Sequence, residues 1–194
     1  EAEQTVTACA ATAMAQVLYL WKDEYAKPET KEAKLAYDIP ARTDVVYQSA
    51  EEVDDQMIPI WVKFSDEAIP ASTTIDWENL KDVYTHRDEN GKVVKDENGN
   101  VVVDGTAEQQ AAVARLMHIC GAAESMYYGP TYAGGSGTGT TQMIYGAYHY
   151  LGFPNVRVHS QSNTDEYGDW VQQLYDELKV SKAVRFTGMS SSGG

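Results

Sequence analysis

The sequence has few basic residues, few cysteines and no long apolar run, and each shortage narrows the classes of protein that it can encode. Lys and Arg together number 15 against 29 Asp and Glu, which gives a formal net charge of −14. Such an acidic chain has little with which to neutralise a row of phosphates or to dock on anionic lipid, so we expect no nucleic-acid and no membrane partner. No apolar stretch approaches the roughly 20 residues that a membrane-spanning helix needs.

Two cysteines are present, Cys9 and Cys120, so one disulfide is the most that the chain could form. Their surroundings differ sharply, because Cys9 lies among small residues and Cys120 lies on an apolar helical stripe. We therefore favour two free thiols with separate roles over a disulfide.

What remains is the composition of an ordinary soluble domain. Hydrophobic residues make up 43% of the 194 residues and charged residues 23%, which is enough for one domain with a sizeable core. No internal repeat and no linker divides the chain. We therefore treat residues 1–194 as a single unit.

Apolar periodicity predicts helices over much of the chain. Residues 9–21 carry apolar side chains at i, i+3, i+4 and i+7, which predicts a helix that Thr7 caps. Further helices are expected at 76–84, at 106–121 with a capping box of Thr106 and Gln109, at 140–151, and from near Asp169 onward. Short strands are expected at 45–47, 60–64, 156–159 and 183–187. This mixture predicts an α+β fold.

Residues 87–105 read RDENGKVVKDENGNVVVDG, in which two Asn-Gly turns flank short valine-rich runs. Asn-Gly between such runs is a strong signal for a tight β-turn. We expect a β-hairpin excursion on the surface of the molecule.

The same segment has some features of a calcium loop, with oxygen-bearing side chains at Asp96, Asn98 and Asn100. However, Val101 stands at the glycine position of an EF-hand and Ala107 at the position of its final glutamate. A turn explains these residues better, and no pair of His and Cys residues is repeated at zinc-ligand spacing. We expect neither a metal site nor a cofactor.

Cys9 lies where the first helix is expected to begin, within the small-residue run TACAATAMA. The unpaired N–H groups and the dipole of a helix N-terminus stabilise a thiolate, which is the form of cysteine that attacks carbonyl groups. The alternative interpretation is a buried cysteine in an alanine-rich helix.

The segment TACAATAMAQVLYLW is similar to the nucleophile motif of the streptopain family, which comprises secreted bacterial cysteine peptidases with a papain-like fold. That motif reads Gly-Cys-Val-Ala-Thr-Ala, then an apolar residue or Thr, then Ala-Gln. The matching residues are Cys9, Ala11, Thr12, Ala13, Ala15 and Gln16. Ala8 and Ala10 depart from the usual Gly and Val, and the extra methyl group of Ala8 lies next to the nucleophile.

Other segments resemble the same family in the same order along the chain. Ile75-Asp-Trp77 resembles its tryptophan-containing segment, and residues 112–130 resemble its stretch ending in Met-x-Tyr-Gly. The loop AGGSGTGTT follows where the family has a Ser/Gly/Ala loop, and residues 170–188 resemble the helix and strand that precede its Gly-Gly-His. Against this pattern, residues 87–105 resemble an insertion.

The resemblance implies that Cys9 is the nucleophile of a cysteine endopeptidase and that the Cys9 backbone N–H helps to hold the oxyanion. It also implies that Ser136, Gly137 and Thr138 and the main chain of Gly194 line the substrate groove. The family's catalytic histidine directly follows a Gly-Gly pair, whereas this sequence stops at Gly193-Gly194. The family's oxyanion-hole glutamine lies some way before the cysteine, whereas only eight residues precede Cys9 here, and Gln4 is too close to be a good substitute. We therefore expect an incomplete catalytic domain that has its nucleophile side and lacks most of its sheet.

The same resemblance implies protein or peptide substrates, an inhibitory propeptide and a secreted or cell-surface location in a bacterium. A rival hypothesis is a non-catalytic binding or adhesion protein built on a degenerate peptidase fold, which the altered Ala8 and the missing histidine favour. The four histidines present are poor substitutes for the general base. They are His86, His118, His149 and His159.

Overall fold

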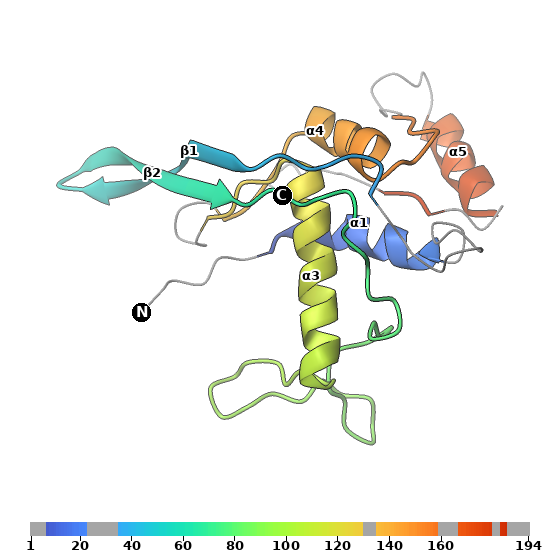
Figure 1. The fold of residues 1–194 in the computed structure, drawn as a ribbon. Helices are drawn as coiled ribbons and strands as arrows, with labels where there is room; N and C mark the ends of the chain where they lie inside the picture. The colour runs from blue at the N-terminus through green and yellow to red at the C-terminus, as the bar shows by residue number, and fades with distance from the viewer. Residues whose placement is uncertain (1–6, 23–34, 130–134, 159–166, 180–182, 186–194) are drawn as a thin grey trace.

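The computed structural model describes residues 7–22, 35–129, 135–158, 167–179 and 183–185. Within these ranges it contains helices and a two-stranded antiparallel sheet. The elements in chain order are α1 (Cys9–Leu20), β1 (Arg42–Val53), β2 (Gln56–Asp66), α3 (Ala107–Ala123), α4 (Thr140–Tyr145), the π-helix η2 (Gly146–Tyr150) and α5 (Tyr167–Lys179). The predicted α+β class is therefore confirmed (Figure 1).

The core lies where α1 crosses the C-terminal half of α3 (Figure 1). Helix α1 buries Ala10, Ala11, Met14, Ala15 and Leu18, at the spacing expected for one helical face. The buried residues of helix α3 include Leu116, Ile119, Cys120, Ala122 and Ala123. A Cβ atom at Gly121 of α3 would lie 3.6 Å from the Cβ atom of Ala11, so the two helices approach closely near the end of α1 that carries Cys9.

Strands β1 and β2 form a hairpin that extends away from the helices (Figure 1). Their register pairs Arg42 with Asp66 and Val53 with Gln56. The turn residues Asp54 and Asp55 have φ angles of 52° and 60°, the left-handed conformation that a two-residue hairpin turn requires. The predicted strands at 45–47 and 60–64 are confirmed, although each is only the middle of a longer strand.

Helix α3 begins as the sequence predicts and ends later. The Thr106 hydroxyl accepts from the Gln109 amide while the Gln109 side chain accepts from the Thr106 amide, which completes the capping box. The expected stop at Gly121 is wrong, because α3 continues to Ala123. A Cβ atom at Gly121 would lie 1.8 Å from the Tyr128 hydroxyl oxygen. Gly121 therefore serves packing and does not cap the helix.

The single helix expected over 140–151 is divided at Gly146 into α4 and the π-helix η2. A Cβ atom at Gly146 would lie 2.3 Å from the Ala123 carbonyl oxygen. This glycine allows η2 to pack directly against the end of α3.

Residues 84–104 fold as a small meander with two tight turns at the foot of α3, as Figure 1 shows. In the first turn the Asp88 carboxylate accepts the backbone N–H groups of Asn90 and Lys92, and in the second Asp96 accepts those of Asn98 and Asn100. The oxygen-bearing side chains that resemble a calcium loop thus form turns, which confirms the turn interpretation.

Three other expectations need correction or restriction. The helix expected at 76–84 is absent, because the Asp76 carboxylate accepts the Asn79 amide and holds a turn there. Residues 156–158 and 183–185 pair with no described strand, and the rest of those two predicted strands lies outside the described residues. Helix α5 begins at Tyr167, two residues before Asp169.

Among the helices that the structure describes, none has the length and apolar character to cross a bilayer.

Candidate active site

Cys9 is the first residue of α1, and it is exposed, as the nucleophile interpretation requires. The backbone N–H groups of the first helical turn have no partner within the helix, so they point toward any negative charge at this end. The predicted cap by Thr7 is wrong, because Ala8 occupies the N-cap position and contributes no side-chain hydrogen bond. The N-cap side chain therefore occupies none of the donors at this end of α1.

Ala8 has a backbone conformation that glycine adopts far more readily. Its φ and ψ angles are 62° and 164°, in a region that is essentially reserved for glycine and costs a residue with a side chain about 1–3 kcal/mol. The Thr12 hydroxyl donates to the Ala8 carbonyl at 3.0 Å and fixes the peptide that precedes Cys9. The departure from the family's glycine thus falls at a strained position beside the candidate nucleophile.

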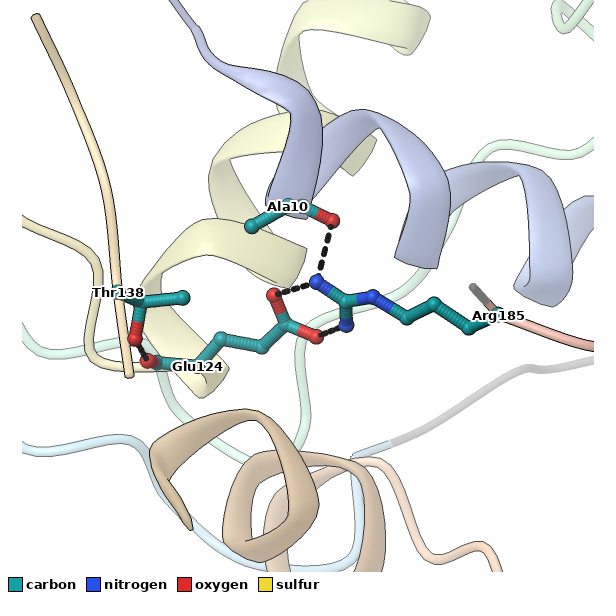
Figure 2. A network of polar contacts seen from close by, with 4 residues as sticks. All are labelled: Ala10, Glu124, Thr138 and Arg185. Atoms are coloured by element: carbon teal, nitrogen blue, oxygen red, sulfur yellow. Dashed lines mark hydrogen bonds and ion pairs between the residues drawn. The ribbon is translucent and has the colours of Figure 1, made fainter. Parts of the chain in front are cut away.

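A buried ion pair lies behind the first turn of α1 (Figure 2). Glu124, the residue that caps the C-terminus of α3, is fully buried. Arg185 donates from Nη1 to Glu124 Oε1 and from Nη2 to Oε2, the latter at 3.1 Å. Arg185 Nη2 also donates to the Ala10 carbonyl at 3.1 Å. One guanidinium group thereby joins α1, the end of α3 and the segment 183–185.

Sequence reasoning missed this pair. Glu124 stands between the buried residues Ala123 and Met126 in an otherwise apolar and small-residue stretch. An isolated carboxylate in such a stretch signals a buried partner. Its partner lies 61 residues further along, so the sequence pattern offers no means of naming Arg185.

The buried groups near this pair have shifted pKa values. Burial raises the pKa of Glu124, and the hydrogen bonds and positive charge of Arg185 oppose that rise. Burial also raises the pKa of Cys120, with a further contribution from the Glu124 charge. Cys120 is fully buried and is not disulfide-bonded to Cys9. The expectation of two free thiols is confirmed, and Cys120 has the properties of an inert one.

The segment expected to line the groove is attached to the chain that follows α3. The Thr138 hydroxyl donates to the Glu124 carbonyl at 2.5 Å (Figure 2). Gly137 exchanges both backbone hydrogen bonds with Tyr127, and the Gly129 amide donates to Ser136 Oγ at 3.1 Å. Thr138 is thus hydrogen-bonded to Glu124, one member of the buried ion pair. Gly194 lies outside the described residues.

Three histidines are described, and each has a contact with a residue other than Cys9. His86 Nδ1 lies 2.7 Å from Asp104 Oδ1, and His118 Nε2 lies 2.7 Å from Asp66 Oδ1. The ring of His149 stacks on those of Tyr37 and Tyr145, at centroid distances of 4.4 and 4.8 Å. His159 lies outside the described residues. In the part of the chain that the structure describes, no three His, Cys, Asp or Glu side chains gather as metal ligands would.

Comparison with known proteins matches this chain to one family. The peptidase C10 family model matches residues 1–194. The active wild-type interpain A cysteine protease of Prevotella intermedia is 27% identical with a TM-score of 0.56, and the match covers 92% of this chain and 56% of that one. A fragment of prointerpain A from the same organism, in a cysteine-to-alanine mutant, is 26% identical with a TM-score of 0.56, and that match covers 91% of this chain and 44% of that one. A search of curated proteins gives no match.

The chain thus spans about half the length of the two solved structures. It matches them with an α+β arrangement of helices and a small sheet. The family match over residues 1–194 and the two similar structures show that this chain belongs to the peptidase C10 family, the streptopain family, and has its papain-like fold.

Proposed function

We propose that this protein is a cysteine endopeptidase that cleaves peptide bonds through a thioester on Cys9. The observation that carries the proposal is an exposed cysteine at the first position of α1, within the segment that resembles the nucleophile motif of the family. A helix N-terminus favours the negative charge of the attacking thiolate. The second cysteine is buried against the core and has no access to a substrate.

In this mechanism the Cys9 sulfur attacks the scissile carbonyl carbon, and the carbonyl oxygen becomes an oxyanion. The Cys9 backbone N–H donates to that oxyanion. Collapse of the tetrahedral intermediate breaks the C–N bond, the amine leaves with a proton from the general acid, and water then hydrolyses the thioester. The resemblance assigns the general base to a histidine that directly follows a Gly-Gly pair, the dipeptide that Gly193-Gly194 forms here.

The substrate groove is assigned to Ser136, Gly137 and Thr138 and to the main chain of Gly194. Support for the first three residues comes from the Thr138 hydrogen bond to Glu124, because the Glu124 side chain reaches the first turn of α1 through Arg185. Substrates would be proteins or peptides. The similar prointerpain A structure is a pro-form, which supports an inhibitory propeptide here, and we place the enzyme outside the bacterial cell or on its surface.

The second candidate function is a non-catalytic binding or adhesion protein on the same fold. The strained Ala8, where the family motif has glycine, favours it. Both candidates predict a folded protein with an exposed Cys9, so they differ only in whether that thiol supports catalysis.

The test is the hydrolysis of unfolded casein by the full-length gene product under reducing conditions. We expect Cys9→Ala to lower kcat/KM by more than about 10⁴-fold, since loss of a nucleophile removes most of the rate enhancement. Cys120→Ala is the matched control, because it removes the other thiol, and it should retain activity. Hydrolysis that survives in Cys9→Ala would contradict the peptidase mechanism, and a parent protein without activity would favour the binding protein.

A further inference from the structure

The Arg185–Glu124 pair is a costly arrangement if its only role is stability. Glu124 is fully buried, and the Arg185 side chain is 18% exposed. Removing two such charges from water cancels much of their mutual attraction, and apolar side chains of similar volume often serve stability equally well. What the pair provides, and apolar side chains do not, is a fixed direction for each hydrogen bond.

Three acceptors surround the guanidinium group. Two are the carboxylate oxygens of Glu124, and the third is the carbonyl oxygen of Ala10, the residue that follows Cys9. Figure 2 shows Arg185 reaching between α1 and the end of α3, with the Ala10 carbonyl on one side and the carboxylate on the other. A planar guanidinium fixes the relative positions of its acceptors, whereas an ammonium group acts as a point charge.

The Glu124 end of the pair is anchored to more than one element. Its backbone amide donates to the Cys120 carbonyl in the last turn of α3, and its carbonyl accepts the Thr138 hydroxyl. Arg185 belongs to the segment 183–185, which lies nine residues before Gly194. The pair therefore ties the turn that carries Cys9 to the end of α3, to the loop of Thr138 and to the segment that leads toward the proposed general base.

We infer that Arg185 and Glu124 are positioning residues for the peptidase reaction, which hold the first turn of α1 in register with the segment that leads to the general base. The inference rests on the proposed function, because it concerns the placement of the same nucleophile. Neither residue touches the substrate in this account. They act through the Ala10 carbonyl, and a misplacement of the nucleophile by about 1 Å lowers the rate by roughly 100-fold.

The experiment compares four variants of the full-length gene product by kcat, KM and melting temperature. Arg185→Lys keeps the charge and loses the fork of hydrogen bonds. The double variant Arg185→Met with Glu124→Met removes both buried charges together. Arg157→Lys and Arg157→Met are the matched controls at an exposed arginine that follows η2.

We expect the double variant to melt within a few degrees of the parent, because no unpaired charge is left buried. Its kcat should fall by about 10- to 100-fold while KM changes by less than about twofold. The kcat of Arg185→Lys should lie between those of the parent and the double variant. The Arg157 controls should match the parent. A double variant with the melting temperature and the kcat of the parent would overturn the inference, since the pair would then be structural only.

A second measurement separates failure of the inference from failure of the proposed function. The rate of Cys9 alkylation by iodoacetamide can be followed against pH by peptide mass in a protein with no peptidase activity. If casein hydrolysis is absent in the parent, the proposed function fails, and the alkylation profile then decides the inference. A changed profile in the double variant, with Arg157→Met unchanged, supports positioning of Cys9 by the pair, and superposable profiles overturn it.

Discussion

At the scale of single residues, a strained backbone conformation lies one position before the candidate nucleophile. Ala8 holds φ and ψ angles of 62° and 164°, and the Thr12 hydroxyl and the start of α1 keep it there. Strained residues persist where the surrounding structure determines their conformation. The first turn of α1 is such a place, because its residues Ala10 and Ala11 are buried against the core.

We predict that Ala8→Gly stabilises the protein. Glycine relieves about 1–3 kcal/mol of strain, and its greater freedom in the unfolded chain costs about 0.4–1 kcal/mol. The net gain should be about 1 kcal/mol, or roughly 2–4 °C in melting temperature for a chain of this size. Thermal unfolding measures it, with Ala13→Gly in the same helix as a control that should destabilise. A lower melting temperature for Ala8→Gly would show that the conformation at this position is not strained.

Residue-level prediction succeeded where the signal was local. The assignment of Cys9 to a helix start needed only the small residues around it and the apolar repeat that follows. The functions assigned to Ser136, Gly137, Thr138 and Gly194 remain predictions. The Glu124–Arg185 pair was beyond reach, because neither residue belongs to a local motif and their contact forms only when α1, α3 and the segment 183–185 meet.

At the scale of elements, one cap and two turns were predicted correctly, whereas the expected cap at Thr7 and the expected stop at Gly121 were wrong. The capping box of α3 and the two turns of the 84–104 meander follow from side chains that bond to their own neighbouring backbone. The helix expected at 76–84 failed because Trp77 and Leu80 pack against the core from a turn instead of a helix. The division of the 140–151 helix at Gly146 depends on the end of α3, which no local pattern reveals.

We predict that the meander is dispensable for folding. Its turns are held by their own backbone and Asp side chains, and most of its residues are exposed. Replacing residues 88–101 with a short Gly/Ser linker should shift the melting temperature by no more than a few degrees, because surface loops tolerate changes in length. The linker keeps the contact of His86 with Asp104 and the cap at Thr106. Loss of soluble expression would show that the meander packs on something essential.

At the scale of the whole molecule, one buried ion pair joins segments from the beginning, middle and end of the described chain. Burial raises the pKa of Glu124 above its ordinary value of 4.5, and Arg185 opposes that rise. Removing Arg185 removes the opposing cause, so the pKa of Glu124 in the folded protein rises further. The folded state then holds a proton that the unfolded state releases near its ordinary pKa.

We therefore predict that the destabilisation caused by Arg185→Met depends on pH. It should be smallest below the ordinary pKa of Glu124, where the carboxyl group is largely protonated in both states, and should grow as the pH rises through the raised pKa of the folded state. At neutral pH the loss should reach about 3 kcal/mol, since a buried charge is left without its partner. Urea unfolding between about pH 5 and pH 8 measures the trend, with Arg157→Met as a control. A loss that stays constant across this range would mean that Glu124 does not titrate as proposed.

The central claim is that Cys9 is the catalytic nucleophile, and the most direct test is covalent labelling of the full-length gene product with a thiol-directed epoxide. Intact mass should show one adduct per molecule, and casein hydrolysis should be lost in proportion to it. Peptide mapping should place the adduct on Cys9, because Cys9 is exposed at a helix N-terminus, whereas Cys120 is buried and its pKa is raised. An adduct on Cys120, or hydrolysis that continues after Cys9 is fully labelled, would contradict the account.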